Sequence, residues 1–107
     1  MCCNSYRHAL ASVRMIRSFR NEAARAAWAR RFVKGVPQEV LRVGNRKLLQ
    51  LHNARSLNDL RAPPGNRLEA LTGARAGQHS MRINDQWRVC FVWRDGDAHD
   101  VEIVDYH

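Results

Sequence analysis

Apolar and polar side chains alternate along residues 81 to 93, and a period of two residues predicts β-strands that bury one face. The Asn84-Asp85 pair interrupts this run where a hairpin loop belongs. A last strand follows around Val101 and Ile103, and residues 67 to 71 supply a further strand before the run. The positions predicted to face the core are Met81, Ile83, Trp87, Val89, Phe91 and Trp93. The second half of the chain therefore predicts an antiparallel meander.

The first half of the chain has the composition and the end signals of helices. Asn21 is suited to cap a helix that has Glu22 at the positive end of its dipole and good helix formers over residues 23 to 32, and Gly35 then ends it. Pro37 is well placed as the first residue of a second helix. Apolar residues recur in this second helix at helical spacing, at Val40, Leu41, Leu48 and Leu51. Two consecutive helices predict a helical hairpin.

Shorter features complete the predicted fold. Residues 15 to 19 have the pattern of a first strand, residues 54 to 60 that of one helical turn, and residues 62 to 66 that of a turn that ends helical structure. Gly44-Asn45 weakens the second helix by about 1 kcal/mol relative to alanine-type residues. The predicted fold class is α+β, with an N-terminal helical hairpin packed on one face of a small, twisted antiparallel β-sheet.

The length of 107 residues fits one compact domain. We expect residues 1 to 14 to be an N-terminal extension and residues 15 to 107 to form the domain. No apolar run approaches the roughly 20 residues that a membrane helix needs, so no membrane role is expected. The odd number of cysteines, with Cys2 and Cys3 adjacent, indicates a reducing compartment and hence the cytoplasm.

The charge distribution suggests a polyanionic partner. The chain has 18 basic and 10 acidic residues, and residues 95 to 107 hold five of the acids and no lysine or arginine. Sixteen of the cations are arginines, whose planar fork suits phosphate. A genome that favours arginine codons would produce the same excess, so composition alone does not decide between the two explanations.

The strand alternation places specific arginines. If Trp87 and Val89 face the helices, Arg88 faces the opposite side of the sheet, and Arg82 does the same on its own strand. Arg75 lies in the loop of residues 73 to 77 and can reach over that side. Three guanidiniums converging on one surface would bind phosphate. Three ordinary surface arginines are an equally good interpretation of the periodicity.

Several segments together resemble the HigB-type toxins of the RelE superfamily. They are the run RAPPGNRLEAL at residues 61 to 71, Gly73, Arg75, Gly77-Gln78, the run RINDQWRVCF at residues 82 to 91, and the ending DAHDVEIVDYH at residues 97 to 107. The resemblance implies a RelE-like fold and a ribosome-dependent messenger-RNA endonuclease that inhibits translation. It also implies a helix-turn-helix, HigA-like antitoxin, with operator DNA bound only through the toxin–antitoxin complex.

The resemblance also assigns site residues. The positions that match the family's catalytic residues are Arg75, Arg88, Asp105, Tyr106 and His107, and we expect Arg67, Arg82 and Gln86 to contact RNA. Metal-independent cleavage uses the RNA 2′-hydroxyl as nucleophile and needs proton transfer and charge stabilisation. His107 can exchange a proton near neutral pH, and the arginines can stabilise the phosphate. No metal and no cofactor are expected.

Two departures from the family pattern support an alternative function. Relatives commonly have a Leu-Lys-Gly-Asp-Arg loop where this chain has Thr72 and Ala74 in place of the lysine and the aspartate, and some have a histidine at the position of Glu69. The alternative is a catalytically weakened homologue that acts with its antitoxin in operon autoregulation. A DNA-binding domain is disfavoured, because no basic recognition helix is evident.

Overall fold

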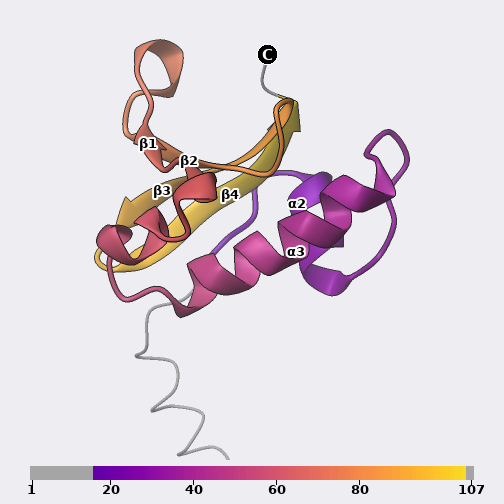
Figure 1. The fold of residues 1–107 in the computed structure, drawn as a ribbon, viewed down its shortest axis with the longest axis horizontal. Helices are drawn as coiled ribbons and strands as arrows, with labels where there is room; N and C mark the ends of the chain where they lie inside the picture. The colour runs from indigo at the N-terminus through magenta and orange to yellow at the C-terminus, as the bar shows by residue number, and fades with distance from the viewer. Residues whose placement is uncertain (1–15, 106–107) are drawn as a thin grey trace, which may run out of the picture.

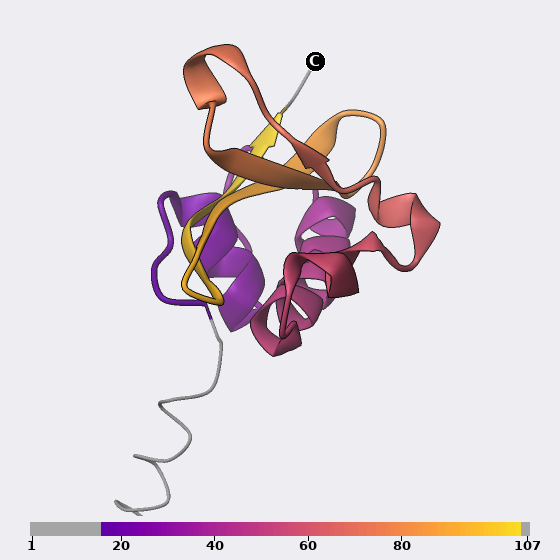
Figure 2. The same cartoon turned by 90° about the vertical axis from the view of Figure 1, so that its left-hand side faces the viewer.

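The computed structural model describes residues 16–105. Two α-helices lie on one face of a four-stranded antiparallel sheet with strand order β1-β2-β3-β4, and the opposite face carries no α-helix of the described chain (Figures 1 and 2). The predicted α+β class is confirmed. The elements are α2 (Glu22–Ala29), α3 (Gln38–Asn53), β1 (Glu69–Ala70), β2 (Gln78–Arg82), β3 (Trp87–Arg94) and β4 (Asp97–Asp105), with short 3-10 helices η1 (Leu57–Arg61), η2 (Pro64–Asn66) and η3 (Gly73–Arg75).

The core lies between the helical pair and the sheet. Phe91 and Met81 from the sheet are fully buried, as are Leu48 and Leu51 from α3. Burying each such side chain contributes about 1.5–3 kcal/mol relative to leaving it in water. The predicted inward positions of the alternating run all lie in this core or pack against its margin, so the period of two correctly separated the faces of β2 and β3.

The pair Gly44-Asn45 joins the two helices, and α3 runs through it without a break. A Cβ built on Gly44 would lie 3.0 Å from Ile103 Cδ1 and 3.6 Å from Ala27 Cβ, so any larger residue would have to displace the Ile103 side chain. The Asn45 side-chain amide donates to the Ala27 carbonyl at 2.8 Å and satisfies a carbonyl at the end of α2. The residues that lower the helix propensity of α3 therefore improve its packing.

Four predicted boundaries need correction. Helix α2 ends at Ala29 rather than Phe32, because Arg30 adopts the left-handed conformation (φ 60°) and the Arg31 amide then bonds back to the Ala26 carbonyl at 2.9 Å. Pro37 is the N-cap of α3, not its first residue. The strand predicted over residues 67 to 71 shortens to β1, since Arg67 is also left-handed (φ 44°).

The fourth correction concerns the strand predicted over residues 15 to 19. Its described part makes only isolated parallel bridges to β4, Ile16 with Ala98 and Phe19 with Val101. Three backbone hydrogen bonds of 2.7–3.0 Å, made by residues 17, 18 and 20, still hold the chain against β4 here. Met15 and the predicted extension of residues 1 to 14 lie outside the described residues. Within the described part of the chain, no helix is long and apolar enough to cross a bilayer.

Candidate functional site

The sheet face that points away from the helices carries a row of three side chains, one from each of the last three strands. Ser80, Cys90 and Glu102 are cross-strand neighbours, since Ser80 pairs with Cys90 and Cys90 with Glu102. All three are buried, with Glu102 only 8% exposed, although no α-helix covers this face. The side chains of Arg88 and Arg75 bond to this row and form a polar site with it.

Arg88 is fixed at one end of the row by three contacts. Its Nε donates to Ser80 Oγ at 2.8 Å and its Nη2 donates to the Arg67 carbonyl at 2.8 Å. The Glu69 carboxylate lies 3.5 Å from the same Nη2. The Arg88 side chain is 13% exposed, so the guanidinium is held in one orientation while part of it reaches solvent. Arg88 faces away from the core, as the alternation of β3 predicts.

Asn66 positions the carbonyl that Arg88 bonds. The Asn66 side chain is fully buried, and its amide donates to the Leu60 carbonyl at 3.0 Å and to Gln50 Oε1 at 3.1 Å. Its Oδ1 accepts from Lys47. The segment predicted as a simple turn is thereby anchored to α3, and the next residue, Arg67, presents its carbonyl to the site.

Arg75 approaches the row from η3, in the connection between β1 and β2. Its Nη1 donates to Glu102 Oε2 at 2.9 Å and to Gln78 Oε1 at 3.0 Å. Burial raises the pKa of the Cys90 thiol, Arg75 and Arg88 oppose this rise, and Glu102 adds to it. All three charges therefore act on Cys90, and the thiol stays protonated beneath them.

The third arginine of the predicted cluster is engaged elsewhere. Arg82 lies opposite Arg88 in the β2–β3 pairing, but its guanidinium forms an ion pair with Asp85 in the hairpin loop. It also lines a hollow of about 330 Å³ beside α3 together with Lys47. The pKa of Lys47 is lowered by burial first and then by Arg46 and Arg82. Positive charge thus extends from the site along this side of α3.

Asp105 is the last described residue and lies at the same end of the sheet as Arg88. It pairs with Trp87 across β3 and β4, and its Oδ2 accepts from Gln86 Nε2 at 2.9 Å. The other two predicted catalytic residues of this segment, Tyr106 and His107, lie outside the described residues. Their meeting with Arg88 and Arg75 stays a prediction.

His79 lies on the other face of β2, against the core. Its ring stacks on Phe91 with a centroid distance of 6.1 Å, and its Nδ1 is buried with no hydrogen-bond partner. Burial, and then the charge of Arg61, lower the pKa of His79. Its position places it outside the polar site.

Sequence reasoning did not select Ser80 or Glu102, and it noted Glu69 only as a departure from the family pattern. Ser80 and Glu102 belong to the site because of the strand register, which brings residues 22 positions apart onto one row. The alternation places both side chains away from the core, and this was the only feature of the sequence that could have indicated that they belong to the site. Among residues 16–105, no group of three His, Cys, Asp or Glu side chains is arranged to hold a metal ion.

A small α+β fold with two helices on one sheet face and fixed guanidiniums on the other is the RelE-like class of toxin folds. The sequence model of one family, the RelE-like toxins of the type II toxin–antitoxin system HigB, matches residues 17–107. The chain belongs to this family. It is therefore a toxin of a type II system, and such a toxin has an antitoxin as its partner.

Named relatives agree with this assignment. The chain is 44% identical to Toxin HigB-1 of Vibrio cholerae over 63 residues, which are 59% of this chain and 66% of that protein. It is 31% identical to Endoribonuclease HigB of Proteus vulgaris over 94 residues, which are 87% of this chain and 100% of the relative. An uncharacterized protein of Haemophilus influenzae is 30% identical over 66 residues, covering 62% of this chain and 65% of its own length.

Proposed function

We propose that this toxin is an endoribonuclease that cleaves messenger RNA on the ribosome in the cytoplasm and so stops translation. The observation that carries the proposal is the Arg88 guanidinium, which Ser80 and the Arg67 carbonyl fix on the sheet face opposite the α-helices, where Arg75 bonds to the same row of side chains. Fixed cations of this kind stabilise the charge that develops on a phosphate during cleavage, because they need no reorganisation at the moment of reaction. The name of the Proteus relative supports the same activity.

The proposed reaction uses the RNA's own 2′-hydroxyl and no metal. The 2′-oxygen attacks the adjacent phosphorus, the bond to the 5′-oxygen breaks, and the products are a 2′,3′-cyclic phosphate and a 5′-hydroxyl. One group must accept the 2′-proton, and another must donate a proton to the leaving 5′-oxygen. Arg88 and Arg75 are permanently charged, so their role is to stabilise the phosphorane and not to transfer protons.

We assign proton transfer to His107, with Tyr106 orienting the phosphate, stacking on a base or sharing in the proton transfer. Asp105 would orient His107. The end of β4 at Asp105, the residue before this pair, lies one register position beyond Val104, the cross-strand partner of Arg88. An imidazole is suited to this role because its unperturbed pKa is about 6.5.

Contacts to the rest of the RNA are assigned to Arg67, Arg82 and Gln86. Arg67 is exposed beside Arg88, and Gln86 is exposed beside Asp105, so both border the site. Arg82 continues the positive surface toward α3. The partner that neutralises the toxin is proposed to be a helix-turn-helix, HigA-like antitoxin, through which the complex binds operator DNA.

One observation favours a second candidate, a weakened homologue that regulates its operon with the antitoxin. The Glu69 carboxylate lies 3.5 Å from Arg88 Nη2 and offsets part of the charge that a phosphate would meet. Thr72, where relatives carry a lysine, adds no cation to the loop before η3. A chain of this kind would bind its antitoxin without stopping growth.

Expression of the full chain without its antitoxin distinguishes the two candidates. An endoribonuclease stops growth and cuts translated messenger RNA, detected by primer extension in a purified translation system. Arg88→Ala and His107→Ala should each lower the cleavage rate by about 10²–10³-fold, the effect typical of losing one transition-state contact. Arg20→Ala removes an equal charge from an exposed position outside the site and should leave the rate unchanged.

Two chemical controls test the mechanism. Messenger RNA with a 2′-O-methyl group at the cleaved nucleotide should resist cleavage, and the downstream fragment of unmodified RNA should carry a 5′-hydroxyl that polynucleotide kinase labels without prior phosphatase treatment. Cleavage of the methylated RNA at the normal rate would contradict the 2′-hydroxyl mechanism. Unimpaired growth together with intact antitoxin binding would favour the regulatory homologue.

A further inference from the structure

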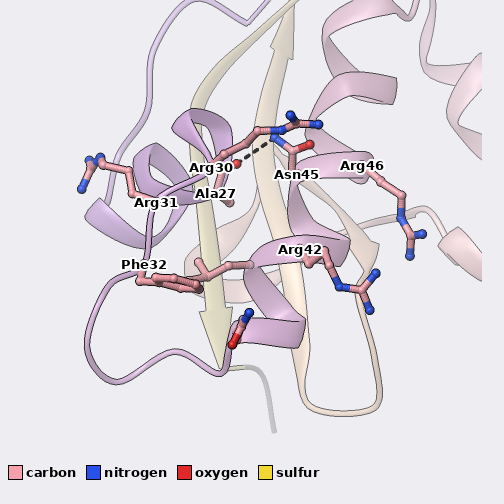
Figure 3. Close-up of a pocket in the computed structure, with 9 residues that line it drawn as sticks. Ala27, Arg30, Arg31, Phe32, Arg42, Asn45 and Arg46 are labelled. Carbon is pink, nitrogen blue, oxygen red and sulfur yellow. Dashed lines mark hydrogen bonds between the residues drawn. The ribbon is translucent and has the colours of Figure 1, made fainter.

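A groove of about 430 Å³ lies between the end of α2 and the first half of α3, in the helical layer. Its buried wall is apolar and comes from Ala27 and Leu41, while Phe32 lies across it and the side chains of α3 border the other side (Figure 3). The groove is separate from the proposed RNA site, which occupies the sheet face that the helices do not cover.

The chain path after α2 builds this groove. Arg30 is left-handed, and the Arg31 amide bonds to the Ala26 carbonyl, so the chain turns sharply as soon as the helix ends. Asn45 ties the same helix end to α3 through its bond to the Ala27 carbonyl. The turn leaves Phe32 outside the core with 71% of its surface exposed, the most exposed of the large hydrophobic residues described. Exposed aromatic rings beside an apolar hollow are typical of protein interfaces.

The rim of the groove is strongly basic. Arg31 is paired with Glu22 at 2.7 Å and Arg42 with Glu39, so two of the four rim arginines are offset. Arg30 and Arg46 form no ion pair with any residue in 16–105. The groove therefore presents an apolar floor with two uncompensated positive charges at its edge.

These features specify one kind of occupant. A second copy of this chain would bring the same arginines against one another, and like charges oppose association. RNA would satisfy the arginines but has no apolar side chain to fill the hollow against Ala27 and Leu41. An amphipathic protein segment with acidic and apolar faces satisfies both the rim and the floor.

We propose that this groove receives an acidic, amphipathic segment of the protein antitoxin, with an apolar side chain beside Phe32 and carboxylates on Arg30 and Arg46. The proposal rests on the chain being a toxin with an antitoxin partner and does not depend on the proposed cleavage mechanism. It leaves the Arg75–Arg88 face uncovered by this segment.

The test uses the full chain and a fluorescently labelled synthetic helix that carries leucines on one face and glutamates on the other. Binding is measured by fluorescence anisotropy with the wild type, Phe32→Ala and Arg30→Gly. The glycine variant removes the charge and keeps the left-handed turn, and Phe32 is exposed, so neither change disturbs the core. The matched control is Arg20→Gly, which removes a charge far from the groove, with circular dichroism to verify each fold.

Each groove variant should weaken binding by about tenfold, while Arg20→Gly leaves it unchanged and higher salt weakens it for the wild type. The same helix with lysines in place of the glutamates should not bind. Affinity that is unaffected by both groove variants overturns the proposal. The proposal is also overturned if both groove variants weaken the binding of a single-stranded RNA oligonucleotide but leave the binding of the acidic helix unchanged. RNA cleavage by Phe32→Ala and Arg30→Gly should equal that of the wild type, so failure of the docking proposal and failure of the proposed function give different results.

Discussion

Arg75 and Glu102 form an ion pair with 2.9 Å between Nη1 and Oε2, although 27 positions separate them in the sequence. Glu102 is 8% exposed and comes from β4, whereas Arg75 comes from η3 in the connection between β1 and β2. The pair therefore joins the β1–β2 connection, at one edge of the sheet, to β4 at the other edge, and it spans Cys90 of β3. Glu102 therefore acts as a positioning residue for Arg75.

Replacement of this carboxylate should lower cleavage more than stability. In Glu102→Gln the charge that orients Arg75 is lost, and we expect the cleavage rate to fall about tenfold, equivalent to ~1.4 kcal/mol of transition-state stabilisation. The unfolding free energy should fall by less than about 2 kcal/mol, since Arg75 is one-third exposed and solvent screens the pair. Translated-RNA cleavage and urea unfolding measure the two effects.

The Arg17–Asp97 pair supplies a matched control. Its Nε–Oδ2 distance is 3.0 Å and its side-chain exposures, 39% and 14%, are close to the 34% and 11% of Arg75 and Glu102, but it lies at the opposite end of β4 from Asp105. Asp97→Asn should change stability by a similar amount and leave cleavage unaltered. Equal losses of cleavage in both variants would show that Glu102 matters only for folding.

The half-buried histidine of β2, His79, should make stability depend on pH. Because burial and Arg61 lower the pKa of His79 in the folded protein, the unfolded chain binds a proton at a higher pH than the folded chain does. The unfolding free energy should therefore decrease as the pH falls below about 6.5, the ordinary pKa of histidine. Urea unfolding of the wild type and of His79→Leu from about pH 7.5 to 5 measures the unfolding free energy of each protein. Because the two proteins share all other titrating groups, the difference between their pH dependences is the contribution of His79. Parallel stability curves for the two proteins would contradict the prediction.

Alanine at position 44 should destabilise the protein although alanine is the better helix former. The gain in helix propensity is about 1 kcal/mol. Against it, the new Cβ would approach Ile103 Cδ1 to 3.0 Å in the core, and overpacking typically costs about 1–3 kcal/mol. We expect Gly44→Ala to lower the unfolding free energy by about 1 kcal/mol net.

Gly65→Ala is the comparison, since a Cβ there meets nothing within 4 Å. Its stability should be equal to or slightly above that of the wild type, because alanine restricts the unfolded chain. Thermal unfolding of both variants measures the difference. A Gly44→Ala protein more stable than the wild type would mean that the α3–sheet contact relaxes easily.

The thiol beneath the two arginines should be unreactive in the folded protein. Cys90 is fully buried, and burial raises its pKa, so neither access nor the thiolate form favours alkylation. Iodoacetamide labelling at neutral pH, followed by mass spectrometry of the peptide that contains Cys90, should show modification in denaturant and almost none without it. Rapid labelling without denaturant would indicate that the site opens to solvent.

The faces of the sheet could be predicted from the sequence, because a period of two residues places alternate side chains on opposite sides wherever the strand lies. The alternation around Arg88 correctly placed that guanidinium away from the core. The end of α2 could not be predicted, since Arg30 takes a left-handed conformation that is uncommon for arginine, and the bond from Asn45 to the Ala27 carbonyl at this helix end joins residues 18 positions apart. Helix propensity alone favoured continuing to Phe32.

The partners within the site were beyond the reach of periodicity. Ser80 and Glu102 meet Arg88 and Arg75 through the register of three strands, and that register includes a shift between Cys90 and Val92 that the alternation of residues does not reveal. Arg82 could be placed on the correct face of its strand from the alternation, but its partner could not be predicted. Its guanidinium forms an ion pair with Asp85 in the hairpin loop instead of joining Arg88 and Arg75. The sequence pattern predicts Asn66 to be an ordinary turn residue. Its buried contacts could not be predicted, because one partner, Gln50, lies in α3, distant in the sequence, and the other, Leu60, lies in the short 3-10 helix η1.

The segment of residues 16 to 20 that is bonded along β4 has a consequence for how the molecule behaves among its neighbours. On one border of the sheet this segment already occupies much of the backbone of β4, and on the other border β1 is only two residues long. Within residues 16–105, neither border leaves a long row of open amides on which a foreign strand could assemble. Fibre formation by strand addition has little backbone from which to start, and a binding protein has to recognise this toxin by its side chains.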